Sequence, residues 1–258
     1  MVSSRRVDGM RSALFIPPFN ELADPTLLAT LAAEAEDAGW DGMFLWDHIR
    51  WGSSVEVADP WIALAAIACR TERLRIGPLV TPLARRRVQK LARETVTLDR
   101  LSGGRLTLGV GLGGDVNGEF GPFGDPAKPR DRARLLDSGL ERLGELWDGE
   151  FQPPPVQQPR IPVWVAGRWP NRRPLRRAAR WDGFFPIDLE RPDDLATFAS
   201  ELRDLRPSRT EPFDLVAEIT PGGDPEPWVA AGATWVLTSI DSPPRLEEVR
   251  AAIEAGPN

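Results

Sequence analysis

The sequence has no tyrosine and, among its 258 residues, a single histidine (His48) and a single cysteine (Cys69). The absence of tyrosine removes the phenol group from the possible acids, bases and nucleophiles, and one histidine excludes a histidine-rich metal site. One cysteine cannot form an internal disulfide, which is typical of a reducing compartment, so we expect a cytoplasmic protein. No apolar run approaches the ~18 residues of a membrane-spanning helix, and we expect no membrane segment.

Charges of the two signs nearly balance, because 32 Lys and Arg residues face 38 Asp and Glu residues and give a net charge of −6. An acidic chain of this kind is unsuited to general nucleic-acid binding. Hydrophobic residues make up 41% of the sequence, enough for a sizeable core, and the length suits one large domain. Residues 1–9 are polar and unpatterned, so we expect a dispensable N-terminal extension before a domain over residues 10–258.

Apolar runs of strand length alternate along the chain with segments of helical period. We predict eight strands, over residues 12–16, 43–46, 74–80, 106–110, 162–166, 182–187, 213–219 and 235–240. A helical pattern follows each of them, most clearly after Asp24-Pro25 and Asp59-Pro60, where an N-cap residue precedes proline. Eight such units in ~250 residues predict a single-domain α/β fold, a closed (β/α)8 TIM barrel. An open, doubly wound sheet is the alternative.

Residues 97–114, TLDRLSGGRLTLGVGLGG, form the most informative stretch. A helix is expected to end here, the chain to reverse at Gly103-Gly104, and a strand to follow with apolar side chains at every second position. The strand leads into a glycine-rich exit, and glycines at such a place let a ligand approach the backbone closely because no Cβ intervenes. Many strand-to-helix turns share this pattern, so the pattern alone is a weak functional signal.

The amino-acid sequence of this stretch closely resembles those of the bacterial luciferase-like monooxygenase family, whose members use FMN or the deazaflavin coenzyme F-420. The match is strong over residues 91–114 and weaker at Trp46-Asp47-His48, at 162–167 with 177–180, and at 231–233. The resemblance implies a (β/α)8 barrel and an oxidoreductase that acts on a small organic substrate. It also implies a homodimer and, if the cofactor is FMN, a partner flavin reductase.

His48 is the main catalytic candidate, because active sites of TIM barrels lie at the C-terminal ends of the strands and His48 follows the second predicted strand. Imidazole ordinarily titrates near neutrality, and Asp47 beside it could fix its tautomer or charge. In the resembled family a histidine at this point often donates a proton or contacts the flavin-type ring. The alternative is a histidine that hydrogen-bonds a loop backbone.

Two arginine clusters follow strand ends, one at residues 85–87 and one at residues 168, 172 and 173. We predict both at helix N-termini, where cations oppose the helix dipole and a bound phosphate or carboxylate would compensate them. The alternative is that they extend to solvent and surface acids. The resembled family places a cofactor phosphate after the fifth strand, which favours the second cluster. Residues 85–87 stand where many relatives keep an Arg-His pair, so a two-histidine mechanism is ruled out.

The predicted cofactor-binding residues follow strands three, four and five: Thr81, Gly111, Gly113, Gly114, Asn117, Gly167 and Arg168. Two arginine clusters suit the polyanionic tail of F-420 better than the single phosphate of FMN, so F-420 is slightly favoured. No nucleophile elbow, metal cluster or dinucleotide fingerprint is visible, and we expect a bound cofactor to supply the difficult chemistry. The alternatives are a non-catalytic barrel that binds a flavin or another phosphorylated ligand, and a cofactor-free phosphosugar enzyme.

Asp188, Glu218 and Asp241 could line the pocket or pair with the arginines, and the sequence gives them no catalytic role. If His48 is structural, the proton would come from solvent or from a carboxyl group such as that of Glu119. Trp46 and Trp169 could flank a planar ring, and core packing is an equal alternative. Cys69 has apolar neighbours in a predicted helix, so we expect it in the core.

Overall fold

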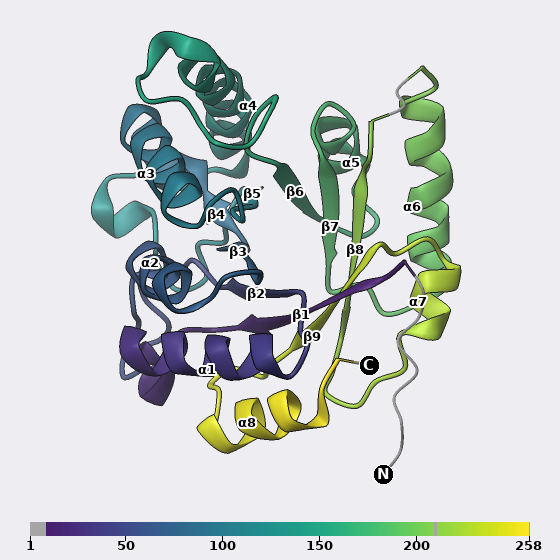
Figure 1. Ribbon diagram of the computed structural model, residues 1–258. Coiled ribbons are helices and arrows are strands. Elements are labelled where there is room, and N and C mark those ends of the chain that lie inside the picture. Colours follow the sequence, from purple (N-terminus) through teal and green to yellow (C-terminus); the bar gives the residue numbers. More distant parts are fainter. Residues whose placement is uncertain (1–8, 209–210, 258) are drawn as a thin grey trace.

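The computed structural model describes residues 9–208 and 211–257 and shows a parallel barrel surrounded by helices (Figure 1). The strands are β1 (Arg11–Ile16), β2 (Gly42–Leu45), β3 (Arg75–Pro78), β4 (Thr81–Pro82), β5 (Leu108–Gly111), β6 (Val163–Arg168), β7 (Gly183–Ile187), β8 (Asp214–Ile219) and β9 (Trp235–Ser239). They are hydrogen-bonded in the order β3-β2-β1-β9-β8-β7-β6-β5-β4. The expectation of a dispensable extension falls almost entirely on residues 1–8, outside the described residues.

The barrel closes through an interrupted strand. β3 and β4 stand at the two ends of the sheet order but follow one another in the chain, separated only by Leu79 and Val80. β3 pairs with β2, β4 pairs with β5, and a parallel bridge joins Ile76 to Leu106. The sheet is therefore a near-closed TIM-type barrel, as predicted, rather than an open doubly wound sheet.

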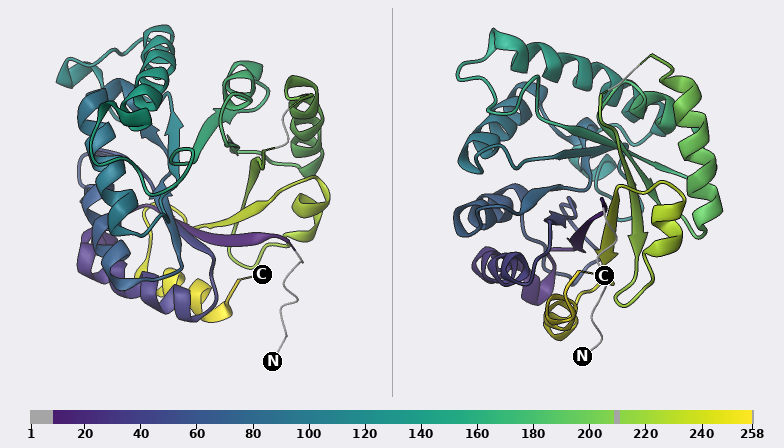
Figure 2. Two further views of the ribbon diagram at one scale, coloured as in Figure 1. Left: turned by 45° about the horizontal axis from the view of Figure 1, so that its top comes forward. Right: turned by 45° about the vertical axis from the view of Figure 1, so that its right-hand side comes forward.

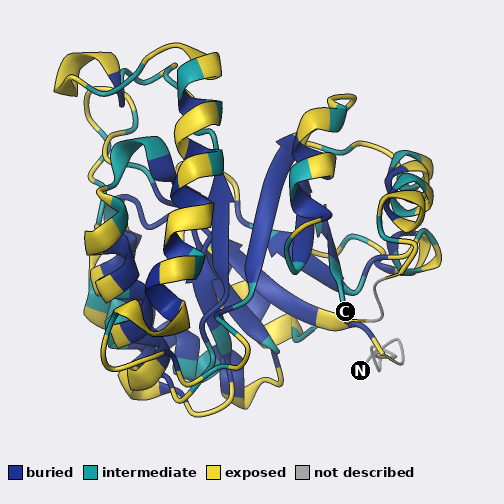
Figure 3. Ribbon diagram, turned by 90° about the horizontal axis from the view of Figure 1, so that it is seen from above, coloured by how far each residue is buried: buried dark blue, intermediate teal, exposed yellow. Residues whose placement is uncertain are grey.

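Helices cover the outside of the barrel, with their apolar faces against the strands and their outer faces exposed (Figures 2 and 3). They are α1 (Pro25–Asp37), α2 (Pro60–Arg70), α3 (Val88–Leu101), α4 (Pro129–Glu145), α5 (Arg172–Ala178), α6 (Pro192–Leu205), α7 (Glu226–Ala230) and α8 (Leu246–Ala255). The carboxylates of Asp24 and Asp59 accept hydrogen bonds from backbone N–H groups in the first turns of α1 and α2, as the cap-plus-proline pattern predicts. None of the described helices is both long and apolar enough to cross a membrane.

Short helical turns complete the connections. Three 3-10 turns cover Asn20–Ala23, Leu83–Arg85 and Gly121–Phe123, and a π-type turn over Leu146–Glu150 ends α4. Because α3 begins only at Val88, the prediction of a helix from residue 85 is wrong at its start. Cys69 is exposed on α2, which corrects the expectation of a core position.

The inside of the barrel is filled by large side chains. Trp164 lies at its centre, with ring centroids 5.1 Å from Phe44 and 5.4 Å from Trp235, and its indole N–H donates to Asp214. The buried residues of this inner cluster are Ala13, Phe15, Phe44, Leu79, Trp164, Ala166, Phe185, Val216, Trp235 and Leu237. This packing closes the barrel below the level at which the strands end, so ligands can enter only above it.

The stretch that carries the family resemblance mainly builds the fold. Asp99 is fully buried and accepts backbone hydrogen bonds from Val156 and Gln157, which fixes the proline-rich connector after α4. Gly103 and Gly104 both have positive φ and turn the chain back. The guanidinium of Arg105 donates to the carbonyl oxygens of Ala68 and Thr71 at the end of α2 and to that of Leu74 just before β3.

Candidate active site

A cavity of about 570 Å³ opens at the C-terminal ends of the strands. Its lining is mostly apolar or aromatic, with a few polar groups, which is typical of a binding site for an organic molecule. Most of the predicted site residues line it: Asp47, His48, Gly111, Gly113, Gly114, Asn117, Gly167 and Arg168. Trp46 also lines the cavity. Thr81 does not line it; its side chain is fully buried and its hydroxyl donates to Asp47.

The glycines at the cavity are required for different structural reasons. A Cβ on Gly111 would lie 2.7 Å from the Val80 side chain, and one on Gly167 would lie 2.3 Å from Pro174. Gly113 has φ of +68° and no room for a Cβ beside Phe120. A Cβ on Gly114, by contrast, would meet nothing within 4 Å. Packing therefore explains the first three glycines, and only at Gly114 is there open space for a ligand.

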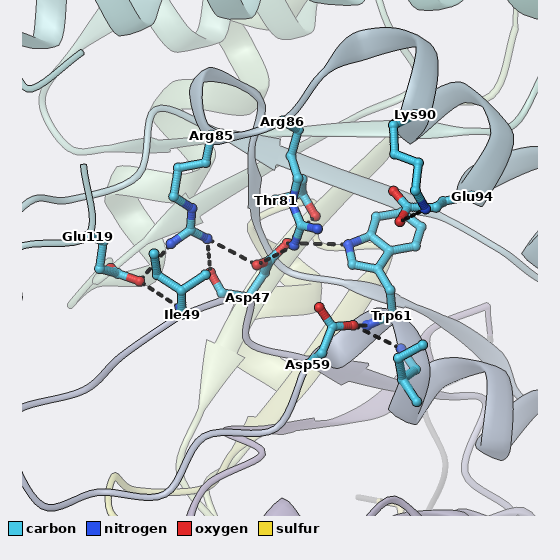
Figure 4. A network of polar contacts seen from close by, with 11 residues as sticks. Asp47, Ile49, Asp59, Trp61, Thr81, Arg85, Arg86, Lys90, Glu94 and Glu119 are labelled. Atoms are coloured by element: carbon cyan, nitrogen blue, oxygen red, sulfur yellow. Dashed lines mark hydrogen bonds and ion pairs between the residues drawn. The ribbon is translucent and has the colours of Figure 1, made fainter. Parts of the chain in front are cut away.

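Asp47 is the centre of a buried polar network (Figure 4). Its carboxylate, on a side chain with 0% exposure, accepts hydrogen bonds from Thr81 Oγ1 at 2.7 Å and from one guanidinium nitrogen of Arg86 at 2.9 Å. Arg85 donates to the Asp47 carboxylate at 3.0 Å and to its backbone oxygen at 2.8 Å. With its acceptors occupied in this way, Asp47 positions the loop and is not the partner of the neighbouring imidazole.

His48 is oriented instead by Glu119, which lies 71 residues further along the chain. The distance from His48 Nδ1 to Glu119 Oε2 is 2.8 Å, and the other carboxylate oxygen accepts from Arg85 at 2.6 Å and from the Ile49 N–H at 2.9 Å. The expectation that Asp47 fixes the imidazole is therefore wrong. Nothing in the local sequence pairs Glu119 with His48; the only hint was its place in the loop after a strand.

Glu119 is almost inaccessible, with 2% exposure. Burial by itself would raise its pKa, but the hydrogen bonds from His48 and Ile49 and the positive charges of His48 and Arg85 hold the pKa below its ordinary value. The carboxylate is therefore ionised at neutral pH and accepts the Nδ1–H of His48. Since His48 lines the cavity and is 25% exposed at its side chain, Nε2 is the ring nitrogen left for a ligand.

Three aromatic rings surround the imidazole. The ring centroid of His48 lies 4.7 Å from that of Trp51, 5.8 Å from Trp46 and 6.2 Å from Phe19. These rings restrict the orientation of the imidazole. Trp46 and Trp51 also line the cavity and give this side of it an apolar surface on which a planar ligand can pack.

Both arginine clusters stand at helix N-termini, as predicted, because Arg87 is the N-cap residue of α3 and Arg172 and Arg173 open α5. Four of the six side chains, however, pair with carboxylates. Arg85 and Arg86 precede the helix and form ion pairs with Asp47 and Glu119, so buried carboxylates, and not a bound anion, neutralise them. In the second cluster, Arg172 pairs with Glu201 on α6. Arg168 alone points to the cavity, where its side chain is 72% exposed and pairs with Asp188.

The comparisons with known proteins agree with this architecture. The family model described as luciferase-like monooxygenase matches residues 10–233. The chain belongs to this family. An F420-dependent glucose-6-phosphate dehydrogenase of Nakamurella multipartita is 36% identical over 131 residues, which are 49% of this chain and 38% of that protein. A protein of the same name from Gordonia bronchialis is 28% identical over 91% of this chain and 75% of its own length.

The luciferase-like fold is also evident from solved structures. The F420-dependent tetrahydromethanopterin reductase of Methanopyrus kandleri superposes with a TM-score of 0.72 at 16% identity, over 95% of this chain and 96% of that one. Several curated relatives are matched over only 38% to 53% of their own length. The relatives and structural neighbours include proteins named for F420 dependence and one solved in complex with FMN.

Proposed function

We propose that this protein transfers hydride between a small organic substrate and a flavin-type cofactor, F-420 in preference to FMN, with His48 handling the substrate proton. The observation that supports this most directly is the His48–Glu119 pair at the cavity, 2.8 Å apart. An ionised carboxylate on Nδ1 fixes one tautomer and leaves Nε2 to exchange a proton with a ligand. No other side chain that lines the cavity, among the described residues, ordinarily titrates near neutrality.

The residues present fit such a cofactor. The volume of about 570 Å³ lies within the ~300–1,000 Å³ of ligand pockets, and the lining offers apolar surface from Trp46, Val80 and Ala166 to a planar ring. Gly114 leaves room for close approach, and the exposed Arg168 would take a phosphate in place of Asp188. When bound, the cofactor supplies hydride transfer, which no side chain of the protein can perform.

The protein supplies the proton transfer and the orientation. In substrate oxidation, neutral His48 accepts the hydroxyl proton at Nε2, and the Glu119 carboxylate stabilises the imidazolium that forms. In the reverse direction the imidazolium returns this proton. Arg85 keeps Glu119 in place through its 2.6 Å hydrogen bond, and the aromatic rings of Trp46 and Trp51 shield the reacting groups from water.

The preference for F-420 now has a different basis. The argument from two free arginine clusters fails, because Arg85 and Arg86 are already paired. Support comes from the relatives of Nakamurella and Gordonia, both of which carry F420 dependence in their names. FMN is the second candidate, since an FMN-bound type II Baeyer-Villiger monooxygenase shares the fold with a TM-score of 0.65. A partner flavin reductase belongs to this second candidate only.

The test is equilibrium titration of the purified protein with F-420 and with FMN, followed by turnover with 2-propanol and with glucose 6-phosphate. We expect tighter binding of F-420 and consumption of cofactor only when a substrate is present. His48→Ala should lower kcat by ~10²–10⁴ and change cofactor affinity much less. Arg50→Ala, an exposed neighbour in the same loop, is the matched control and should retain full kcat.

Three results would contradict the proposal. Binding of neither cofactor would remove the proposed chemistry altogether. Binding without turnover on any of a wider panel of alcohols and ketones would favour a non-catalytic binding protein. Full turnover by His48→Ala would show that the proton comes from solvent or from another group.

A further inference from the structure

Glu218 is a carboxyl group in the cavity to which the proposed chemistry gives no task. It lies on β8, two residues after Val216, whose side chain is in the inner core of the barrel. Because side chains two apart on a strand point to the same face, Glu218 also points inward, one step nearer the C-terminal end. It lines the cavity and is half-buried there.

The sheet order places Glu218 across the cavity from His48 and Glu119. β8 is the middle strand of nine, and the interrupted strand β3–β4 forms both ends of the same order. In a near-closed ring the middle strand therefore lies opposite β4, beside which the Asp47 network is built. The lining between the two polar sides is largely apolar and includes Phe15, Leu79, Phe185 and Ile187. A ligand that spans the cavity can reach both sides.

The charges on the two sides differ. On the side of His48, the cations Arg85 and Arg86 match the anions Asp47 and Glu119. On the side of Glu218, Ser239 of β9 hydrogen-bonds to Glu218, and among the described residues no cation is paired with this carboxyl group. Burial, together with the negative charge of Asp188, raises the pKa of Glu218, while Ser239 and Arg168 oppose the change. A carboxyl group in this situation gains most from a hydrogen-bond donor.

Positive charge is scarce in the cavity. Among the described residues that line it, Arg168 is the only lysine or arginine. Arg168 is itself paired with Asp188, so these lining residues offer no unpaired lysine or arginine to neutralise an anionic ligand. A phosphate or carboxylate on the substrate would face Glu218 and Asp188 without compensation, which is costly in a partly desolvated site.

We propose that Glu218 binds a hydrogen-bond-donating group of the substrate, a hydroxyl or a protonated amine, and that the enzyme selects substrates without phosphate or carboxylate. This inference rests on the proposed function for the identity of the reaction, but not for the selectivity of the cavity. Glu218 is then a specificity residue on the side of the cavity opposite His48. The reacting carbon and the recognised donor belong to different ends of one substrate molecule.

The experiment compares three probes of nearly equal size: cyclohexylmethanol, cyclohexylmethylamine and cyclohexanecarboxylate. Their affinities for the full chain are measured by calorimetry, with and without F-420, for the wild-type protein and for Glu218→Gln. We expect the wild type to bind the amine and the alcohol at least ~10-fold more tightly than the carboxylate, since Glu218 accepts a hydrogen bond from the first two and repels the third. Glu218→Gln should lower amine affinity at least ~10-fold and alcohol affinity less, and should not weaken carboxylate binding.

A control and a second readout make the outcome decisive. Glu247→Gln on α8 makes the same change of charge outside the cavity and should alter no affinity. The melting temperature of Glu218→Gln should not fall, because the variant removes a partly buried carboxyl group that has no cation partner. Equal binding of the amine and the carboxylate by the wild type, or unchanged amine affinity in Glu218→Gln, would overturn the inference. So would an equal loss of F-420 affinity, which would make Glu218 a cofactor contact.

These outcomes are separable from those of the proposed function. Probe selectivity is read without cofactor, so a protein that bound neither F-420 nor FMN could still show it. Conversely, activity with F-420 on glucose 6-phosphate would support the proposed cofactor and contradict the assignment of Glu218.

Discussion

Replacement of Glu119 by glutamine separates the charge of this residue from its shape. The carboxylate receives hydrogen bonds from Arg85, His48 and Ile49 at 2.6, 2.8 and 2.9 Å. A glutamine with its oxygen toward Arg85 and Ile49 keeps two of these contacts in weaker, neutral form. Its amide group then meets the Nδ1–H of His48, so that one hydrogen bond is lost or the imidazole must change its tautomer.

The expected cost follows from these contacts. Loss of a partner from a buried ion pair costs about 3–5 kcal/mol, and a charged hydrogen bond contributes about 1.5–3 kcal/mol. Arg85 retains Asp47 as a partner, which reduces the penalty. We therefore expect Glu119→Gln to lower the free energy of unfolding by about 2–4 kcal/mol at neutral pH.

The pH dependence makes this prediction specific. The pKa of Glu119 is lower in the folded protein than its ordinary value of about 4.3, so its contribution is fully present above that value. The contribution is lost as the pH falls through the lower, folded-state pKa, where the protonated side chain resembles glutamine. The difference in unfolding free energy between wild type and Glu119→Gln should therefore shrink as the pH is lowered through this range.

Urea denaturation of both proteins at neutral pH and at several acidic pH values measures this difference. Glu150→Gln is the matched control, because Glu150 also pairs with an arginine, Arg142 at 2.6 Å, but on the exposed surface where solvent screens the pair. The control should lie close to the wild type throughout. An equal difference in unfolding free energy between wild type and Glu119→Gln at neutral and acidic pH would refute the reasoning. It would show that the shape of Glu119, and not its charge, stabilises the protein.

Two further predictions concern the scaffold. Glu36 accepts backbone hydrogen bonds from residues 72–74, which lead into β3. Glu36→Ala should therefore lower the free energy of unfolding, measured in urea, by at least about 2 kcal/mol, whereas Glu34→Ala on the same helix should cost little. Gly113→Ala should lower the melting temperature, because residue 113 has a positive φ and no room for a Cβ. Gly114→Ala should not, because a Cβ at residue 114 would meet open space. Equal melting temperatures for these two variants would contradict the account of the glycine-rich exit.

The periodic features of the fold were readable from the sequence, because they depend on neighbours within a few residues. The eight predicted strands correspond to the observed barrel once β3 and β4 are taken as one interrupted strand. The cap at Asp59 was equally visible, since its partners are the next residues of the chain. Cys69 shows the limit of this reasoning: α2 is apolar around most of its circumference, so composition alone does not identify the exposed side.

The candidate site was less predictable, because its decisive contacts join distant parts of the chain. His48 was identified from its chemistry and its place at a strand end, and its catalytic role stays a prediction. Its partner Glu119 is 71 residues away, and the ion pairs of Arg85 cross 34 and 38 residues. The prediction that residues 85–87 hold a bound anion failed for the same reason. Local sequence showed the positive charge but not the buried carboxylates that neutralise it.

The aromatic surroundings of His48 make the site directly observable in solution. A chain with one histidine gives a single set of imidazole signals in a proton NMR spectrum, and they need no mutagenesis to assign. The ring of Trp51 at 4.7 Å and that of Trp46 at 5.8 Å shift these signals through their ring currents. Any ligand that enters the cavity and moves either ring would therefore displace the resonances of His48, whatever the chemical identity of that ligand.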